Sequence, residues 1–107
     1  MSGRLTTHVL DTATGRPAAG IPVALTRDGV AVAEAVTNAA GRTDAPLLQG
    51  DAFGPGVYEI TFALGAHFGG VGFLDRVPVR FTVTDAAEHH HVPLLISPFA
   101  YSTYRGS

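Results

Sequence analysis

Alternating apolar and polar residues mark several short segments of this chain. Apolar side chains take every second position in Tyr58–Leu64 and in Val77–Val83, with polar residues such as Glu59 and Arg80 between them. Ile21–Leu25 repeats the alternation. Because successive side chains of a β-strand point to opposite faces of a sheet, this period of two predicts strands with one buried face.

Turn residues separate these segments at short intervals. The pair Asp28-Gly29 predicts a β-hairpin that joins Ile21–Leu25 to the next apolar segment, Val30–Thr37. Further strands are expected at Leu5–Asp11, Val92–Ile96 and Ala100–Arg105. A total of about seven or eight short strands predicts an all-β, two-sheet sandwich.

A helix fits this pattern only around residues 66–68. It has to be short, because Gly69, Gly70 and Gly72 follow at once and glycine is a poor helix former. The length of 107 residues predicts a single domain, 1–107. The sequence contains neither an internal repeat nor a linker.

The chain carries few charges for its size. Charged residues make up 15% of the sequence and hydrophobic residues 46%, whereas an average soluble domain is about 25% charged. Such a composition argues against disorder. Because the centres of protein interfaces are depleted in charge, it also predicts an oligomer.

Several classes of function are excluded by composition. The formal charge of −2 lacks the basic excess that binding to nucleic acid requires. Without cysteine, disulfides, thiolate zinc sites and a cysteine nucleophile are impossible. The sequence lacks the G-x-x-x-x-G-K motif that would indicate nucleotide binding. The N-terminal residues show no apolar signal segment and no run of about 18 apolar residues occurs, so we expect a cytoplasmic protein with no membrane partner.

The strand periodicity places histidines on outward faces. If Leu5 and Val9 point to the core, His8 points away from it, and an inward Val92 sends His89 and His91 outward. Isolated outward histidines are usually solvated. These histidines lie in apolar segments of a charge-poor chain, which favours an interface or a cleft.

The residues alone leave other chemistries open. His89 and His91 form an H-x-H pair that could hold a catalytic zinc ion with His8 as third ligand, although no carboxylate stands at a characteristic spacing. A Ser-His-Asp triad is conceivable from Ser97 or Ser102 with His8 and Asp11, although no G-x-S-x-G context supports it.

Two arginines have no role fixed by the pattern. Arg42 follows Gly41 in a predicted turn, where a solvated cation is the ordinary interpretation. Arg105 lies in the terminal segment Tyr104–Ser107, which directly follows a predicted strand. Chain ends are usually frayed and polar, whereas this terminal segment continues directly from a strand. We therefore expect it to be docked against the rest of the protein.

Four segments together resemble a known family, the 5-hydroxyisourate hydrolases, which are transthyretin-related proteins of purine catabolism. The segments are LTTHVLD at Leu5–Asp11, GRT at 41–43, HHHVPLL at 89–95 and YSTYRGS at 101–107. The resemblance covers essentially the whole chain. Its most discriminating element is the terminal Tyr-Arg-Gly-Ser, which the hormone-carrying transthyretins lack.

The resemblance implies a transthyretin-like β-sandwich of two four-stranded sheets with one short helix. Four chains are expected to form a dimer of dimers, with active sites at the dimer–dimer interface and neither a cofactor nor a metal ion. The implied catalytic residues are His8, Arg42 and His91. The implied substrate-binding residues are Tyr104, Arg105, Gly106 and Ser107.

The sequence departs from the family pattern at two positions. The middle residue of the family's His-Tyr-His is His90, which the strand periodicity places away from the cleft. The residue before Gly41, often Asp in the family, is Ala40, in the turn that presents Arg42.

The implied reaction is hydrolysis of 5-hydroxyisourate to 2-oxo-4-hydroxy-4-carboxy-5-ureidoimidazoline. A neutral imidazole from His8 or His91 is expected to activate water, and the Arg42 guanidinium to stabilise the oxyanion. The alternative is a transthyretin-like carrier of an aromatic ligand. Such a carrier needs an apolar channel, whereas the implied lining is polar and cationic.

Overall fold

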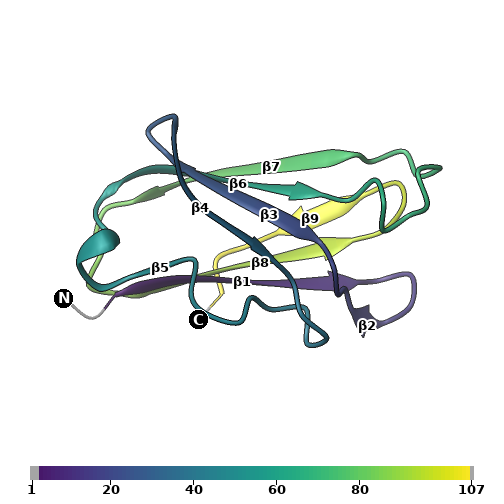
Figure 1. Cartoon of the computed structure of the whole chain (residues 1–107), viewed down its shortest axis with the longest axis horizontal. Helices are drawn as coiled ribbons and strands as arrows, with labels where there is room; N and C mark the ends of the chain where they lie inside the picture. Colours follow the sequence, from purple (N-terminus) through teal and green to yellow (C-terminus); the bar gives the residue numbers. More distant parts are fainter. Residues whose placement is uncertain (1–2, 107) are drawn as a thin grey trace.

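The computed structural model describes residues 3–106, which form nine β-strands and one short 3-10 helix. Two sheets lie face to face, and most of their long strands run roughly along the long axis of the molecule (Figure 1). The elements are β1 (Arg4–Asp11), β2 (Arg16–Pro17), β3 (Pro22–Arg27), β4 (Val30–Val36), β5 (Leu48–Gln49), η1 (Gly50–Ala52), β6 (Gly56–Ala63), β7 (Arg76–Val83), β8 (His89–Ile96) and β9 (Tyr101–Thr103).

The strand order places the two strands that carry the outward histidines, β1 and β8, side by side. One sheet runs β2-β1-β8-β9, with β5 paired to the start of β1, and the other runs β4-β3-β6-β7. In the first sheet β1 and β8 are parallel neighbours, in contrast to the antiparallel pairing elsewhere. The predicted all-β sandwich of two sheets is therefore confirmed. The first sheet has five strands rather than four because Leu48–Gln49 adds a short edge strand.

The predicted position of the short helix was wrong. Residues 65–70 form consecutive turns, because Gly69 and Gly70 adopt φ values of 68° and 75°, which a right-handed helix excludes. The helical residues are instead Gly50–Ala52, a single 3-10 turn between β5 and β6. Within residues 3–106, no helix has the length and apolar character needed to cross a membrane.

The core lies between the sheets and follows the predicted alternation. On β1 the burial pattern alternates strictly, with Leu5 and Val9 fully buried and His8 on the opposite face. Leu94 on β8 and Phe62 on β6 are likewise fully buried. Each such apolar side chain stabilises the fold by about 1.5–3 kcal/mol. This packing fixes the two central strands of the first sheet, and with them the outward histidines.

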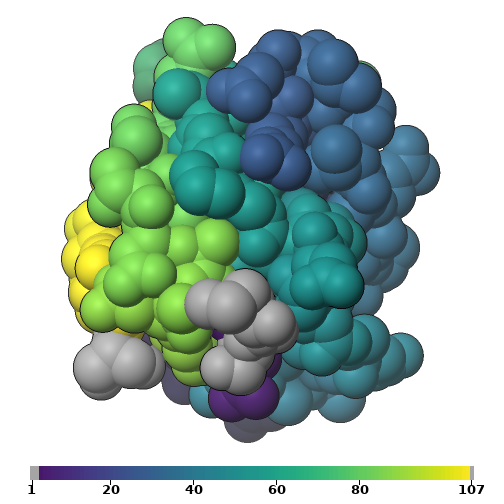
Figure 2. Space-filling view, turned by 90° about the vertical axis from the view of Figure 1, so that its left-hand side faces the viewer, coloured from purple at the N-terminus to yellow at the C-terminus, as the bar shows by residue number. Residues whose placement is uncertain are grey.

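The predicted hairpin at Asp28-Gly29 is confirmed. Both residues have positive φ, 50° and 85°, as the central residues of a type I′ hairpin turn do. The Asp28 carboxylate accepts a hydrogen bond of 3.0 Å from the Val57 backbone N–H, which ties the turn to β6. In the end view of Figure 2 this hairpin, in blue, lies on the opposite side from β9, in yellow.

Candidate functional site

The parallel register of β1 and β8 brings the outward side chains together. Thr6 lies opposite His91, and Arg4 lies opposite His89. His8 follows two residues after Thr6 on the same face of β1. The predicted outward placement of the three histidines is confirmed, and His90 is buried on the other face, with its ring edge-on to Phe53 at 5.5 Å between centroids.

A loop between β4 and β5 places Arg42 over the same face. The Val9 backbone N–H donates to the Gly41 carbonyl at 2.8 Å, and Arg42 forms an isolated antiparallel bridge with His8. Gly41 has φ of 75°, and a Cβ there would lie 2.5 Å from the Val9 carbonyl oxygen. Only glycine allows both the backbone conformation and this close approach.

Asn38 holds the loop in shape. Its side-chain oxygen accepts hydrogen bonds from the backbone N–H groups of Ala40 and Arg42, at 2.9 and 3.2 Å. Its own backbone N–H donates to the Arg42 carbonyl at 2.7 Å. The loop that presents Arg42 is therefore built by Asn38, and the methyl group of Ala40 has no part in these bonds.

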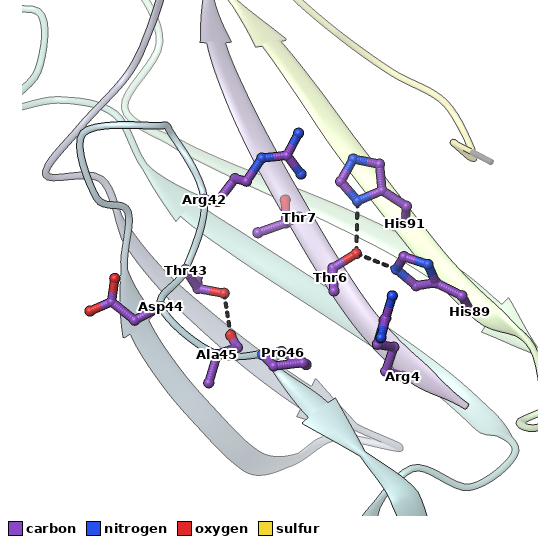
Figure 3. A pocket seen from close by; sticks show the side chains of 10 residues that line it. All are labelled: Arg4, Thr6, Thr7, Arg42, Thr43, Asp44, Ala45, Pro46, His89 and His91. Carbon is purple, nitrogen blue, oxygen red and sulfur yellow. Dashed lines mark hydrogen bonds between the residues drawn. The ribbon is translucent and has the colours of Figure 1, made fainter. Parts of the chain in front are cut away.

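These elements surround a hollow of about 400 Å³ on the outer face of the five-stranded sheet (Figure 3). That size suits a small ligand. Most of its polar lining consists of arginine, histidine and threonine side chains. The lining residues are Arg4, Thr6, Thr7, Arg42, Thr43, Asp44, Ala45, Pro46, His89 and His91.

Burial and a neighbouring cation lower the pKa values of His8 and His91. Burial lowers the pKa of His91 from its ordinary value of 6.5, and the positive charge of Arg42 lowers it further, followed by His89 and His8. Burial and then Arg42 also lower the pKa of His8, although a backbone hydrogen bond with Ala40 acts in the opposite direction. Near pH 7 both imidazoles are therefore unprotonated bases beside a permanent cation.

The C-terminal segment docks beside His91. The Gly106 backbone N–H donates to the His91 carbonyl at 2.7 Å, and a Cβ at Gly106 would lie 2.7 Å from the His91 ring. Tyr104 and Arg105 line a separate hollow, next to β7, and Arg105 pairs with Glu88 at 3.1 Å. The chain end is docked as far as Gly106. Ser107, a predicted substrate-binding residue, lies outside the described residues.

The alternative chemistries gain no support from these positions. Across residues 3–106, no three histidine or carboxylate side chains form a cluster suited to a metal ion, so His8, His89 and His91 are not assembled into a ligand set. Asp11 faces the core, opposite to His8 on β1, and its carboxylate lies 2.8 Å from His67 Nε2. The conceivable serine triad is therefore not formed.

Sequence reasoning missed the hydroxyl of Thr6. Its Oγ1 lies 2.7 Å from His89 Nε2 and 2.8 Å from His91 Nδ1. The available signal was its periodicity, since Thr6 shares the outward face of β1 with His8. That the hydroxyl joins two imidazoles depends on the β1–β8 register, which the sequence did not reveal.

The fold and the site define a class of protein: a transthyretin-like β-sandwich with a polar hollow of imidazole and guanidinium groups on the outer face of one sheet. Comparison with known proteins then identifies the family. The HIUase/Transthyretin family model matches residues 5–106, and the chain belongs to this family.

The chain is similar both to 5-hydroxyisourate hydrolases and to a transthyretin. A 5-hydroxyisourate hydrolase from Mesorhizobium japonicum is 57% identical over 116 residues, covering 98% of this chain and 93% of its own. The structure of Klebsiella pneumoniae 5-hydroxyisourate hydrolase aligns with a TM-score of 0.87 at 39% identity, over 98% of this chain and 99% of its own. Transthyretin from Sparus aurata aligns with a TM-score of 0.88 at 27% identity, over 96% of each chain.

Proposed function

We propose that this protein hydrolyses 5-hydroxyisourate to 2-oxo-4-hydroxy-4-carboxy-5-ureidoimidazoline. The observation that carries the proposal is the placement of His91 and Arg42 in one small hollow, with His8 alongside Arg42. The names of the similar hydrolases from Mesorhizobium japonicum and Klebsiella pneumoniae support the same reaction.

The histidine pair supplies the proton transfers. Water is a weak nucleophile at neutral pH, and a neutral imidazole within reach can remove its proton as the oxygen attacks the substrate carbonyl. Lowered pKa values keep both His8 and His91 in this basic form. The resulting imidazolium can return the proton to the ring nitrogen that departs.

Arg42 supplies the charge stabilisation. Its guanidinium is always protonated and offers five N–H donors in a planar fork. The loop bonds to Asn38 and Val9 hold its backbone beside His8, so the fork is available where negative charge develops on the carbonyl oxygen. No step of this mechanism requires a metal ion or another cofactor.

The proposal also assigns substrate binding to four C-terminal residues, Tyr104, Arg105, Gly106 and Ser107. The docking of Gly106 against His91 supports this for the end of the chain. Tyr104 and Arg105 line a different hollow of the protomer. For these two residues, contact with substrate requires a cleft that is formed with a second protomer.

The proposal includes a homotetramer, arranged as a dimer of dimers. Large apolar side chains support it, because Val71, Phe73 and Phe99 are 87%, 76% and 74% exposed. Phe73 and Phe99 lie on neighbouring loops, which are joined by a bond from the Phe73 N–H to the Pro98 carbonyl. Light scattering on the purified protein tests the assembly, and a monomer would contradict it. A cytoplasmic location stays a prediction that cell fractionation can test.

The decisive experiment follows freshly prepared 5-hydroxyisourate with and without the protein. Catalysis is expected to accelerate both its decay and the appearance of a single enantiomer of product. Decay at the spontaneous rate would reject the proposal. Parallel assays after exhaustive chelation separate it from a zinc hydrolase, because turnover is then expected to persist. A carrier would instead bind an aromatic ligand without accelerating the decay.

The pH dependence of kcat/KM is expected to reflect the lowered histidine pKa values. Because the neutral imidazole is the active form, activity is retained as the pH falls from 7 to 6.5 and is lost only below the pKa of His91, which lies under 6.5. Arg42→Gln removes a positive charge that disfavours protonation, so the residual activity of this variant should be lost at a higher pH. An acidic limb centred above 6.5 in the wild-type profile would contradict this assignment.

A further inference from the structure

We propose that Thr6 and His89 form a hydrogen-bonded chain that fixes where His91 carries its proton, and that Thr6 is a positioning residue for the ring opening. This inference rests on the proposed function, because it concerns the same hollow. It assigns the base, His91, and the ring nitrogen that acts, Nε2.

Both hydrogen bonds of Thr6 with the two imidazoles are short. Thr6 Oγ1 lies 2.7 Å from His89 Nε2 and 2.8 Å from His91 Nδ1, as the dashed lines of Figure 3 show. The two imidazole centroids are 6.1 Å apart, so the hydroxyl is the link between the rings. A threonine is suited to this place, because branching at Cβ restricts its side-chain rotamers.

Counting protons decides the direction of the two bonds. A hydroxyl has one proton to donate, so the two imidazole nitrogens cannot both accept from Thr6. When His91 takes a proton from water, both of its nitrogens carry hydrogen, and Nδ1–H must donate to Thr6 Oγ1. The Thr6 proton is then free to point to His89 Nε2. If the same pattern holds at rest, His91 Nε2 keeps its lone pair on the side that faces Arg42 in Figure 3.

This arrangement gives each group a constant role through the reaction. The water oxygen bonds to the substrate carbonyl carbon while one water proton moves to His91 Nε2. The ring C–N bond then breaks, and the same proton passes to the departing nitrogen. The second water proton leaves as the new carboxyl group ionises. Nδ1–H donates to Thr6 throughout, which orients the ring and stabilises the imidazolium, as the third group of a catalytic triad does.

The surroundings of His89 agree with its role as an acceptor. Burial lowers the pKa of His89, and the charges of Arg4 and His90 lower it further. A neutral His89 can present an unprotonated Nε2 to the Thr6 hydroxyl, whereas an imidazolium cannot. Arg4, which lies opposite His89 on β1, thereby favours the neutral His89 that accepts the hydrogen bond from the Thr6 hydroxyl.

The test compares Thr6→Val, which keeps the shape and removes the hydroxyl, with Thr6→Ser, which restores it. Thr61→Val is the matched control, since Thr61 is a half-buried residue in the middle of β6, on the other sheet. We expect Thr6→Val to lower kcat about 10–100-fold with little change in KM, because a misoriented base loses part of its usual contribution. Thr6→Ser should recover most of the rate, and Thr61→Val should leave it unchanged.

A second readout does not depend on turnover. Nitrogen-15 NMR of the imidazoles should find the His91 proton on Nδ1 in the wild type and distributed over both nitrogens in Thr6→Val. A wild-type His91 protonated on Nε2, or a Thr6→Val variant with unchanged kcat and tautomer, would overturn the proposal. Failure of the proposed function is distinguishable, because it would leave the expected tautomers without turnover. Should Thr6→Val not fold, His89→Phe, at an exposed position, removes the acceptor instead and should also redistribute the His91 proton.

Discussion

Replacing His91 with alanine is expected to lower kcat for 5-hydroxyisourate about 10²–10⁴-fold, the usual contribution of a positioned general base. The side chain lies on the outer face of β8, away from the apolar residues packed between the sheets. Its removal therefore opens no cavity in the core, and the unfolding midpoint should stay close to that of the wild type. Stopped-flow decay of the substrate and thermal unfolding measure the two quantities.

A matched control is available in the same chain. His67 is a histidine outside the hollow that interacts with the Asp11 carboxylate at 2.8 Å, and His67→Gln keeps an N–H donor for that carboxylate. This variant should retain full turnover. Equal losses in both variants would indicate a general effect on the protein and would remove His91 from the proposed chemistry. Wild-type activity in His91→Ala would do so directly.

Arg42→Ala is expected to lower kcat about 10²–10³-fold. Removal of one oxyanion donor typically costs about 2.7–4 kcal/mol of transition-state stabilisation. Arg42 is exposed and is placed by backbone bonds from its loop, so its side chain can be removed without unpacking the sandwich. The loss should fall on kcat more than on KM, because the negative charge develops only in the transition state.

Arg42→Lys separates charge from shape. Lysine keeps the positive charge and loses the planar fork, so its activity should lie between those of the alanine variant and the wild type. Arg76→Ala, an exposed arginine on the other sheet, serves as the control and should be fully active. If Arg42→Lys were as active as the wild type, directional hydrogen bonding would have no part in the rate. Full activity of Arg42→Ala would exclude the proposed oxyanion role.

The strands of the site were predictable from the sequence because their alternation is strict. Leu5 and Val9 could face only the core, and the period of two alone therefore places His8 on the outward face. The same argument placed His91 outward and His90 inward on β8. The hairpin at Asp28-Gly29 was equally predictable, since few residue pairs accept positive φ in succession.

The partners across the site were not predictable in this way. Periodicity describes one strand at a time, whereas the pairing of β1 with β8 joins residues more than eighty positions apart. The bridge between His8 and Arg42 depends on a loop held by Asn38, for which the sequence offered no signal beyond a turn. The short helix was misplaced for a related reason, because local propensity around residues 66–68 did not include the backbone conformation of the glycines that follow.

The sequence by itself determined the sandwich, the outward histidines and, through its resemblance to a family, the set of residues that carry the proposed chemistry. Only the tertiary structure decided that Thr6 joins His89 to His91, that Gly106 docks on the His91 backbone, and that Tyr104 and Arg105 line a separate hollow. The physical reason is that a buried face is specified by local periodicity, whereas hydrogen-bond partners between distant strands are specified by register and loop conformation, which arise only when the sheets pack.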